Sequence, residues 1–197
     1  MQQAHIPTLN TPATGYENRR IISGQKFHVL HQEVEIDAAV DAVWDEVAGN
    51  FVNSGEIAAS INASRCLSGD LTQGLGAERF LDFDFQGTQV QAKERIVEYR
   101  QCGDTRDFTY DVYESKGSPL TVKVYSTWIV RKSEEGKTYL GTAFIFRAKI
   151  AFLTGMIGQQ LAKSGSLRTG LLAYKHYLET GEKRLDSAKL NERYPAD

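Results

Sequence analysis

The chain has 197 residues, of which 41% are apolar and 24% are charged, and its formal net charge is −2. This length is sufficient for one domain with a hydrophobic core, and the ordinary charged fraction excludes a chain that is disordered throughout. The near-neutral charge argues against a nucleic-acid binder, which needs a basic face. No apolar run approaches the roughly 20 residues that span a bilayer. Because the first ten residues also lack a secretory signal pattern, we expect a cytoplasmic protein without an integral membrane segment.

Cysteine and histidine residues are sparse and scattered. Cys66 and Cys102 form no CxxC motif, and His28 and His31 are three residues apart, which places them on opposite faces of a strand. We therefore predict two free thiols, no metal site and no cofactor.

The first half of the chain begins with an irregular segment and continues with a strand and a helix. Residues 1–26 show no periodicity and are predicted to form an N-terminal arm. Residues 27–36 alternate as a strand does. In residues 37–49 the apolar side chains follow helical spacing, and a second short helical turn is expected in residues 51–60. The spaced apolar residues are Val40, Val43, Trp44 and Val47.

Six further strands are expected before residue 149, separated by short turns that contain glycine. Short connections imply antiparallel pairing, because a parallel crossover needs a dozen or more residues. The expected strands are 61–68, 77–86, 88–99, 107–114, 121–131 and 138–148.

The last third of the chain changes to helical spacing. Apolar residues recur every three or four positions from 150 to about 180 and predict a long helix. Each interior glycine costs about 1 kcal/mol relative to alanine, so we expect a kinked or broken helix, or one that approaches the sheet closely. The glycines are Gly155, Gly158, Gly165 and Gly170. The polar segment 182–197 is predicted to be a C-terminal tail.

These elements predict an α+β domain over residues 27–181. A curved antiparallel sheet has to bury one face, and the long helix is the only predicted element large enough to cover it. We therefore expect a helix-grip arrangement, in which a seven-stranded antiparallel sheet wraps around the C-terminal helix and two short helices follow the first strand.

Several segments carry a family resemblance. VEIDAAVDAVWDEV spans the end of the first strand and the following helix, and it includes the pair Val43 and Trp44. GLGAERFLDF (74–83) and KERIVEY (93–99) stand where two later strands are expected. This order resembles the helix-grip superfamily (SRPBCC), which includes START lipid-transfer domains and the polyketide cyclase/dehydrase group.

The resemblance covers residues 27–180 and is interrupted at SGEIAAS (54–60), where the family usually has an aromatic-proline segment. It implies a cavity between the sheet and the helix that holds an apolar or amphipathic small molecule.

Strand alternation indicates which side chains face that cavity. The strand 121–131 is ambiguous, and only the resemblance favours Tyr125 on the inner face. The expected ligand-binding set is Arg79, Leu81, Phe83, Phe85, Glu94, Phe108, Tyr110, Tyr125, Thr142, Phe144, Ile157 and Leu161, with Gln32 as a further polar candidate.

Most of these side chains are apolar, and an apolar pocket with a few placed polar groups is typical of a small-molecule site. Because a buried lone charge is costly, we expect Arg79 and Glu94 to pair with each other or with a ligand.

Three functions remain open on the sequence. The first is binding of a hydrophobic small molecule, such as a lipid, polyketide or isoprenoid, by a monomer or homodimer. The second is a cyclase or dehydratase, with Glu94 as acid/base and Arg79 or Tyr110 stabilising an oxyanion. The third is an interaction module without a small-molecule ligand.

Overall fold

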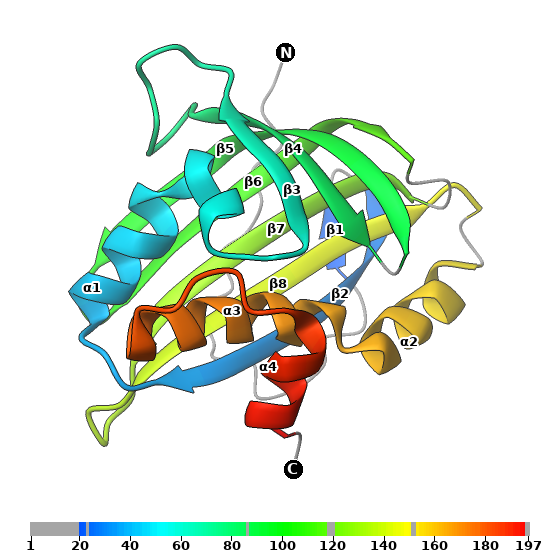
Figure 1. Cartoon of the computed structure of the whole chain (residues 1–197). Helices are drawn as coiled ribbons and strands as arrows, with labels where there is room; N and C mark the ends of the chain where they lie inside the picture. Colours follow the sequence, from blue (N-terminus) through cyan, green and yellow to red (C-terminus); the bar gives the residue numbers. More distant parts are fainter. Residues whose placement is uncertain (1–19, 23, 86, 118–120, 151–152, 196–197) are drawn as a thin grey trace.

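The sheet is the largest element of the structure. The computed structural model describes residues 20–22, 24–85, 87–117, 121–150 and 153–195. Eight antiparallel strands form a sheet in the order β1-β2-β8-β7-β6-β5-β4-β3, which curves around the C-terminal helices (Figure 1). The strands are β1 (Arg20–Ile22), β2 (Gln25–Ile36), β3 (Ile61–Cys66), β4 (Glu78–Phe85), β5 (Thr88–Cys102), β6 (Thr105–Lys116), β7 (Thr121–Lys132) and β8 (Thr138–Ala148).

The seven strands expected from the sequence are all present, and β1 is added to them. β1 pairs with the first residues of β2, so the described end of the segment 1–26, predicted as an arm, joins the sheet. β2 also pairs with β8, and the long connection between β2 and β3 carries the short helices. From β3 to β8 every strand pairs with the next one in sequence, as short turns require.

Short helices follow β2, as expected, although the structure has three helical segments where the sequence predicts two. They are α1 (Val40–Trp44), η1 (Asp45–Gly49) and η2 (Phe51–Glu56). Their apolar side chains point into the space enclosed by the sheet, where Val43, Trp44, Val47 and Phe51 are all buried. These helices therefore close one end of the space between the sheet and α3.

The predicted C-terminal helix is present as two helices, α2 (Thr154–Ser164) and α3 (Ser166–Thr180). The break falls at Gly165, whose φ of +67° lies in the left-handed region that glycine adopts without strain. One of the four glycines in the pattern thus ends a helix instead of weakening its interior.

A further helix, α4 (Ser187–Arg193), lies in the segment that was expected to be a tail. Asp186 caps its first turn by accepting a hydrogen bond from the backbone N–H of Lys189 at 2.9 Å. Leu190 is 1% exposed and packs with Leu172 and Ala173 of α3. This segment is therefore packed against the domain.

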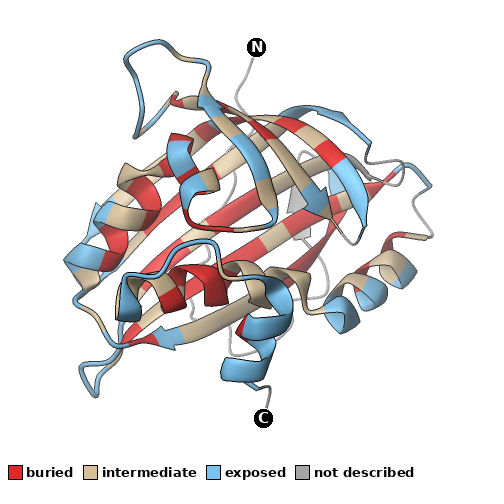
Figure 2. Ribbon diagram, viewed as in Figure 1, coloured by how far each residue is buried: buried red, intermediate tan, exposed pale blue. Residues whose placement is uncertain are grey.

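The main core lies between the short helices, the sheet and α3. Ile96, Phe108 and Leu140 of the sheet meet Leu171 and Tyr174 of α3, and all five side chains are at most 5% exposed. The buried segments gather along the middle of the sheet and the sheet-facing side of α3 (Figure 2). Since each such side chain contributes about 1.5–3 kcal/mol on burial, this region holds the two layers together.

Helix α2 reaches the sheet through a close approach to β2. A Cβ atom at Gly158 would lie 2.8 Å from Nδ1 of His28, whereas a Cβ at Gly170 in α3 would meet no heavy atom within 4 Å. His28 is itself buried. The expected close approach of the helix to the sheet is thus found at Gly158.

The two glycines predict opposite effects on stability. Gly158→Ala has to displace the His28 ring or α2, and we expect it to lower the free energy of unfolding by about 1–3 kcal/mol. Gly170→Ala gains helix propensity in open space and should raise it by up to about 1 kcal/mol. Chemical denaturation of both variants checks this, and equal effects would contradict the close approach.

Candidate functional site

The strand register determines which side chains line the inner face of the sheet. Arg79 lies opposite Glu94, and Phe108 lies opposite Trp128, which packs edge-on against Tyr174 of α3 at 5.3 Å between ring centroids. Directly opposed residues share a face. The structure places nine of the expected residues on the inner face of the strands: Arg79, Leu81, Phe83, Phe85, Glu94, Phe108, Tyr110, Thr142 and Phe144.

The assignment of Tyr125 to the inner face is wrong. Tyr125 lies opposite Ile145 and packs against Phe27 at 5.9 Å between ring centroids, in an apolar cluster on the outer face of the sheet. The inner positions of β7 are held by Ser126 and Trp128 instead. β7 lies inside the sheet and is buried on both faces, so its hydrophobic pattern could not distinguish them.

Arg79 and Glu94 form a buried ion pair on the inner face. Nε and Nη2 of Arg79 both lie 2.6 Å from Oε2 of Glu94, and the two residues are 6% and 4% exposed. Nη1 of Arg79 donates to the carbonyl oxygen of Phe51 at 2.6 Å and to Oγ of Ser54 at 3.0 Å. The guanidinium thus connects the sheet to η2 and has a partner at each of its nitrogens.

The same guanidinium is enclosed by aromatic rings. It lies 4.0 Å from the centroid of Phe51 and 5.2 Å from that of Tyr110. Contacts of this kind contribute about 2 kcal/mol or more when they are shielded from water. Arg79 is therefore held by ionic, hydrogen-bonding and stacking contacts together.

Burial shifts the acid–base behaviour of this group of residues. It raises the pKa of the Glu94 carboxyl above its ordinary value, although the facing guanidinium of Arg79 acts in the opposite direction. Burial and the nearby charge of Glu94 raise the pKa of Tyr110 to about 12, and burial also raises that of Tyr174 to about 12. Both phenols are thus neutral hydrogen-bonding groups at physiological pH.

Exposure differs between the two ends of the inner face. At the end closed by η2, Phe108 is 2% exposed and meets Trp44 and Phe51 edge-on, so this expected ligand contact belongs to the packed core. Toward α2, Phe146 and Val90 are buried, but several other apolar side chains that face the interior remain only half buried. These include Phe83, Phe85, Phe144, and Ile157 and Leu161 of α2. This end of the interior therefore retains partly exposed apolar surface.

Sequence reasoning missed several members of the site. Phe51 and Ser54 bind Arg79 from η2, partly through a backbone carbonyl that carries no sequence signal. His28 lies opposite Phe146 on the inner face, with ring centroids 5.9 Å apart. His28 is two residues before Leu30, so strand alternation places both on the same face, and this signal could have identified His28 as an inner-face residue.

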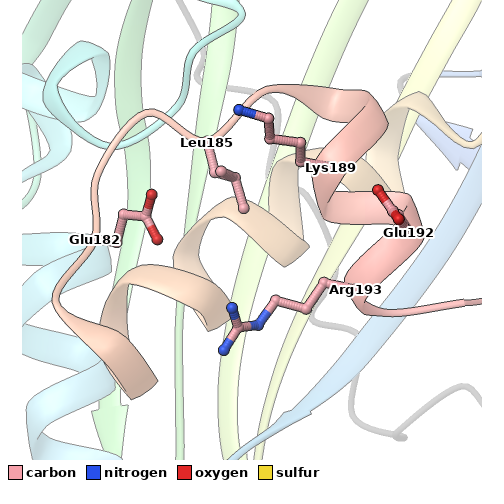
Figure 3. A pocket seen from close by; sticks show the side chains of 5 residues that line it. All are labelled: Glu182, Leu185, Lys189, Glu192 and Arg193. Atoms are coloured by element: carbon pink, nitrogen blue, oxygen red, sulfur yellow. The ribbon is translucent and has the colours of Figure 1, made fainter.

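A shallow hollow lies elsewhere, between the segment after α3 and helix α4 (Figure 3). Its lining is mostly charged and comes from Glu182, Leu185, Lys189, Glu192 and Arg193. Leu172 and Ala173 of α3 face α4, whereas Leu171 and Tyr174 face the main core. The hollow is therefore separate from the inner face of the sheet.

The described part of the chain has neither a cluster of metal ligands nor a membrane-spanning helix. No group of three or more His, Cys, Asp or Glu side chains there is arranged to hold a metal ion. None of the helices described is long and apolar enough to cross a membrane.

Comparison with known proteins identifies the fold. No protein-family model matches the chain, and no curated protein sequence does. Norcoclaurine synthase from Thalictrum flavum superposes with a TM-score of 0.56 at 17% identity, over 80% of this chain and 96% of that one. Ginseng major latex-like protein 151 from Panax ginseng gives 0.54 at 15%, over 72% and 97%.

A START superfamily protein from Mycobacterium smegmatis also superposes, with a TM-score of 0.50 at 14% identity, over 72% of this chain and 97% of that one. The chain adopts the helix-grip fold. This agrees with the resemblance found in the sequence. At identities of 14–17%, the likeness to these structures establishes the architecture and leaves the function to be argued from the inner face of this helix-grip protein.

The buried ion pair predicts a strong dependence of stability on both partners. Glu94→Leu leaves the Arg79 guanidinium buried without a counter-charge and should lower the free energy of unfolding by about 3–5 kcal/mol. The double variant Arg79→Met/Glu94→Leu should recover part of that loss. The control is Glu114→Gln, which breaks the exposed pair with Lys93 and should have little effect. Additive effects of the two core substitutions in urea denaturation would contradict the coupling.

The raised pKa of Tyr174 predicts a loss of stability in alkali. Because the folded protein keeps this proton to about pH 12 and the unfolded chain loses it near pH 10, the contribution is complete below pH 10. It should fall by about 2–3 kcal/mol as the pH rises through 12. Tyr174→Phe removes that dependence. Denaturation between pH 9 and 12 tests it, and identical slopes for the two proteins would rule out the burial effect.

Proposed function

We propose that this protein binds an apolar or amphipathic small molecule, of lipid, polyketide or isoprenoid type, between the inner face of the sheet and helices α2 and α3. The observation that carries the proposal is the half-buried apolar surface at the α2 end, which includes Phe83, Phe144 and Leu161. A core formed only for stability would bury these side chains as fully as it buries Phe108 and Leu140.

The fold neighbours are compatible with this function and do not select the ligand. One is named as a synthase, another as a START superfamily protein and a third as a latex-like protein. One architecture thus accommodates several roles, and the inner face of each protein determines which. A cytoplasmic location, a monomeric or homodimeric state and the absence of nucleic-acid binding stay predictions.

A cyclase or dehydratase activity is the second candidate, with Glu94 as acid/base and Arg79 or Tyr110 at the oxyanion. The raised pKa of Glu94 favours it, because a general acid works best when its pKa is near the working pH. The geometry favours binding instead, since Oε2 of Glu94 already accepts two contacts from Arg79. Glu94→Gln with unchanged turnover of an identified substrate would exclude the catalytic role.

Binding can be tested with the neutral apolar fluorophore N-phenyl-1-naphthylamine. We expect saturable binding with one site per chain, and a loss of affinity of about tenfold or more in Val124→Trp. Val124 lies on the inner face of β7 opposite Phe146 and is half buried, so an indole at this position occupies the proposed site.

The matched control is Tyr125→Trp, one residue further along β7 and on the outer face. It should bind the fluorophore as the unmodified protein does, and circular dichroism should show both variants folded. If the folded protein binds no fluorophore, or if both tryptophan variants lose it equally, the interaction module without a small-molecule ligand becomes the better hypothesis.

A further inference from the structure

A row of polar side chains crosses the inner face within its apolar surroundings. Gln32 of β2 lies opposite Thr142 of β8, and Oγ1 of Thr142 is 3.2 Å from Oγ of Ser126 in β7. Ser126 in turn lies opposite Tyr110 of β6. Thr142 and Ser126 are 3% and 2% exposed. We call Gln32, Thr142, Ser126 and Tyr110 the inner polar row.

One atom of the inner polar row lacks a partner. Oε1 of Gln32 is buried and accepts no hydrogen bond in the described structure. A buried acceptor without a donor is costly, and native proteins leave few of them. The neighbouring hydroxyls of Thr142 and Ser126 can each donate or accept. The row therefore offers an acceptor and hydroxyl groups to a third polar group.

The charges beside the row cancel. Arg79 is bound by Glu94, and its remaining nitrogen donates to Phe51 and Ser54. Every nitrogen of Arg79 thus already contacts a partner within the protein, and the carboxylate of Glu94 would repel an anionic ligand. Burying an uncompensated carboxylate costs far more than burying a neutral hydroxyl that is hydrogen-bonded.

Apolar side chains continue from the row toward α2. Phe144 lies opposite Ser126 on one side and Leu30 on the other, and its ring centroid is 5.5 Å from that of Phe146. A polar group bound at the row would direct an attached apolar chain along these rings.

From these contacts we propose that the inner polar row binds one neutral hydroxyl group of an otherwise apolar ligand, and that the site discriminates against the corresponding carboxylate. The hydroxyl donates to Oε1 of Gln32 and accepts from Thr142 or Ser126. This inference rests on the proposed function and specifies its ligand class as apolar alcohols or phenols.

The test is competition against N-phenyl-1-naphthylamine at pH 8 by three molecules with the same chain: 1-decanol, its methyl ether, and decanoate. Decanol should displace the fluorophore at a concentration about 3–10 times lower than the ether, because the ether has no proton to donate. Decanoate, which is ionised at this pH, should need at least tenfold more than decanol.

The variant Gln32→Leu removes the acceptor. It should bind the fluorophore normally, lose the preference for decanol over the ether, and melt about 3 °C higher, since a buried acceptor without a donor has been replaced by an apolar group. The matched control is Gln91→Leu on the outer face, where Gln91 donates to Asp82 at 3.0 Å. This control should keep the preference for decanol.

The outcomes separate the two proposals. If the fluorophore binds but decanol, ether and decanoate compete equally, or if Gln32→Leu keeps the preference for decanol, the inner polar row has no role in recognition and the binding function stands. Tighter binding of decanoate than of decanol would also overturn the inference. If the unmodified folded protein binds no fluorophore, both proposals fail.

Discussion

The buried pair of Arg79 and Glu94 is the interaction on which the interior depends. It brings an unlike pair of charges into the apolar space between sheet and helices, where either one alone would be costly. The arginine also holds the backbone of η2 through Phe51, so the short helices are fixed relative to the sheet by a polar contact as well as by packing. With this pair neutralised, the remaining inner face can be apolar and uncharged.

That arrangement divides the domain into a packed part and an accessible part. α1, η1 and η2 close one end over Phe108 and the sheet-facing side of α3, and most of the apolar side chains that cluster there are buried. At the other end α2 touches β2 closely at Gly158, but leaves Phe83 and Phe144 half buried. The two ends of the same sheet therefore differ in how completely their apolar side chains are buried, and the proposed ligand site lies at the less buried end.

Most of the fold and much of the inner face could be predicted from the sequence, because alternation is clear wherever one face of a strand meets solvent. β4 is such a strand, with Asp84 exposed between Phe83 and Phe85. The inner face of β7 could not be predicted in this way because both faces of the strand are buried, and Tyr125 was assigned to the wrong face. The partners of Arg79 in η2 and the buried oxygen of Gln32 depend on three-dimensional proximity, which no local pattern reports.

The break at Gly165 separates two helices that differ in how many side chains they bury against the rest of the domain. α3 contributes Leu171 and Tyr174 to the main core, whereas the buried residues of α2 are Thr154 and Gly158. Because α2 buries fewer side chains than α3, opening of α2 alone should cost less free energy than opening of α3. We therefore expect the amide hydrogens of α2 to exchange with solvent through a local opening, and those of α3 only when the whole domain unfolds. The helix nearest the half-buried surface would then be the least stable one that covers it.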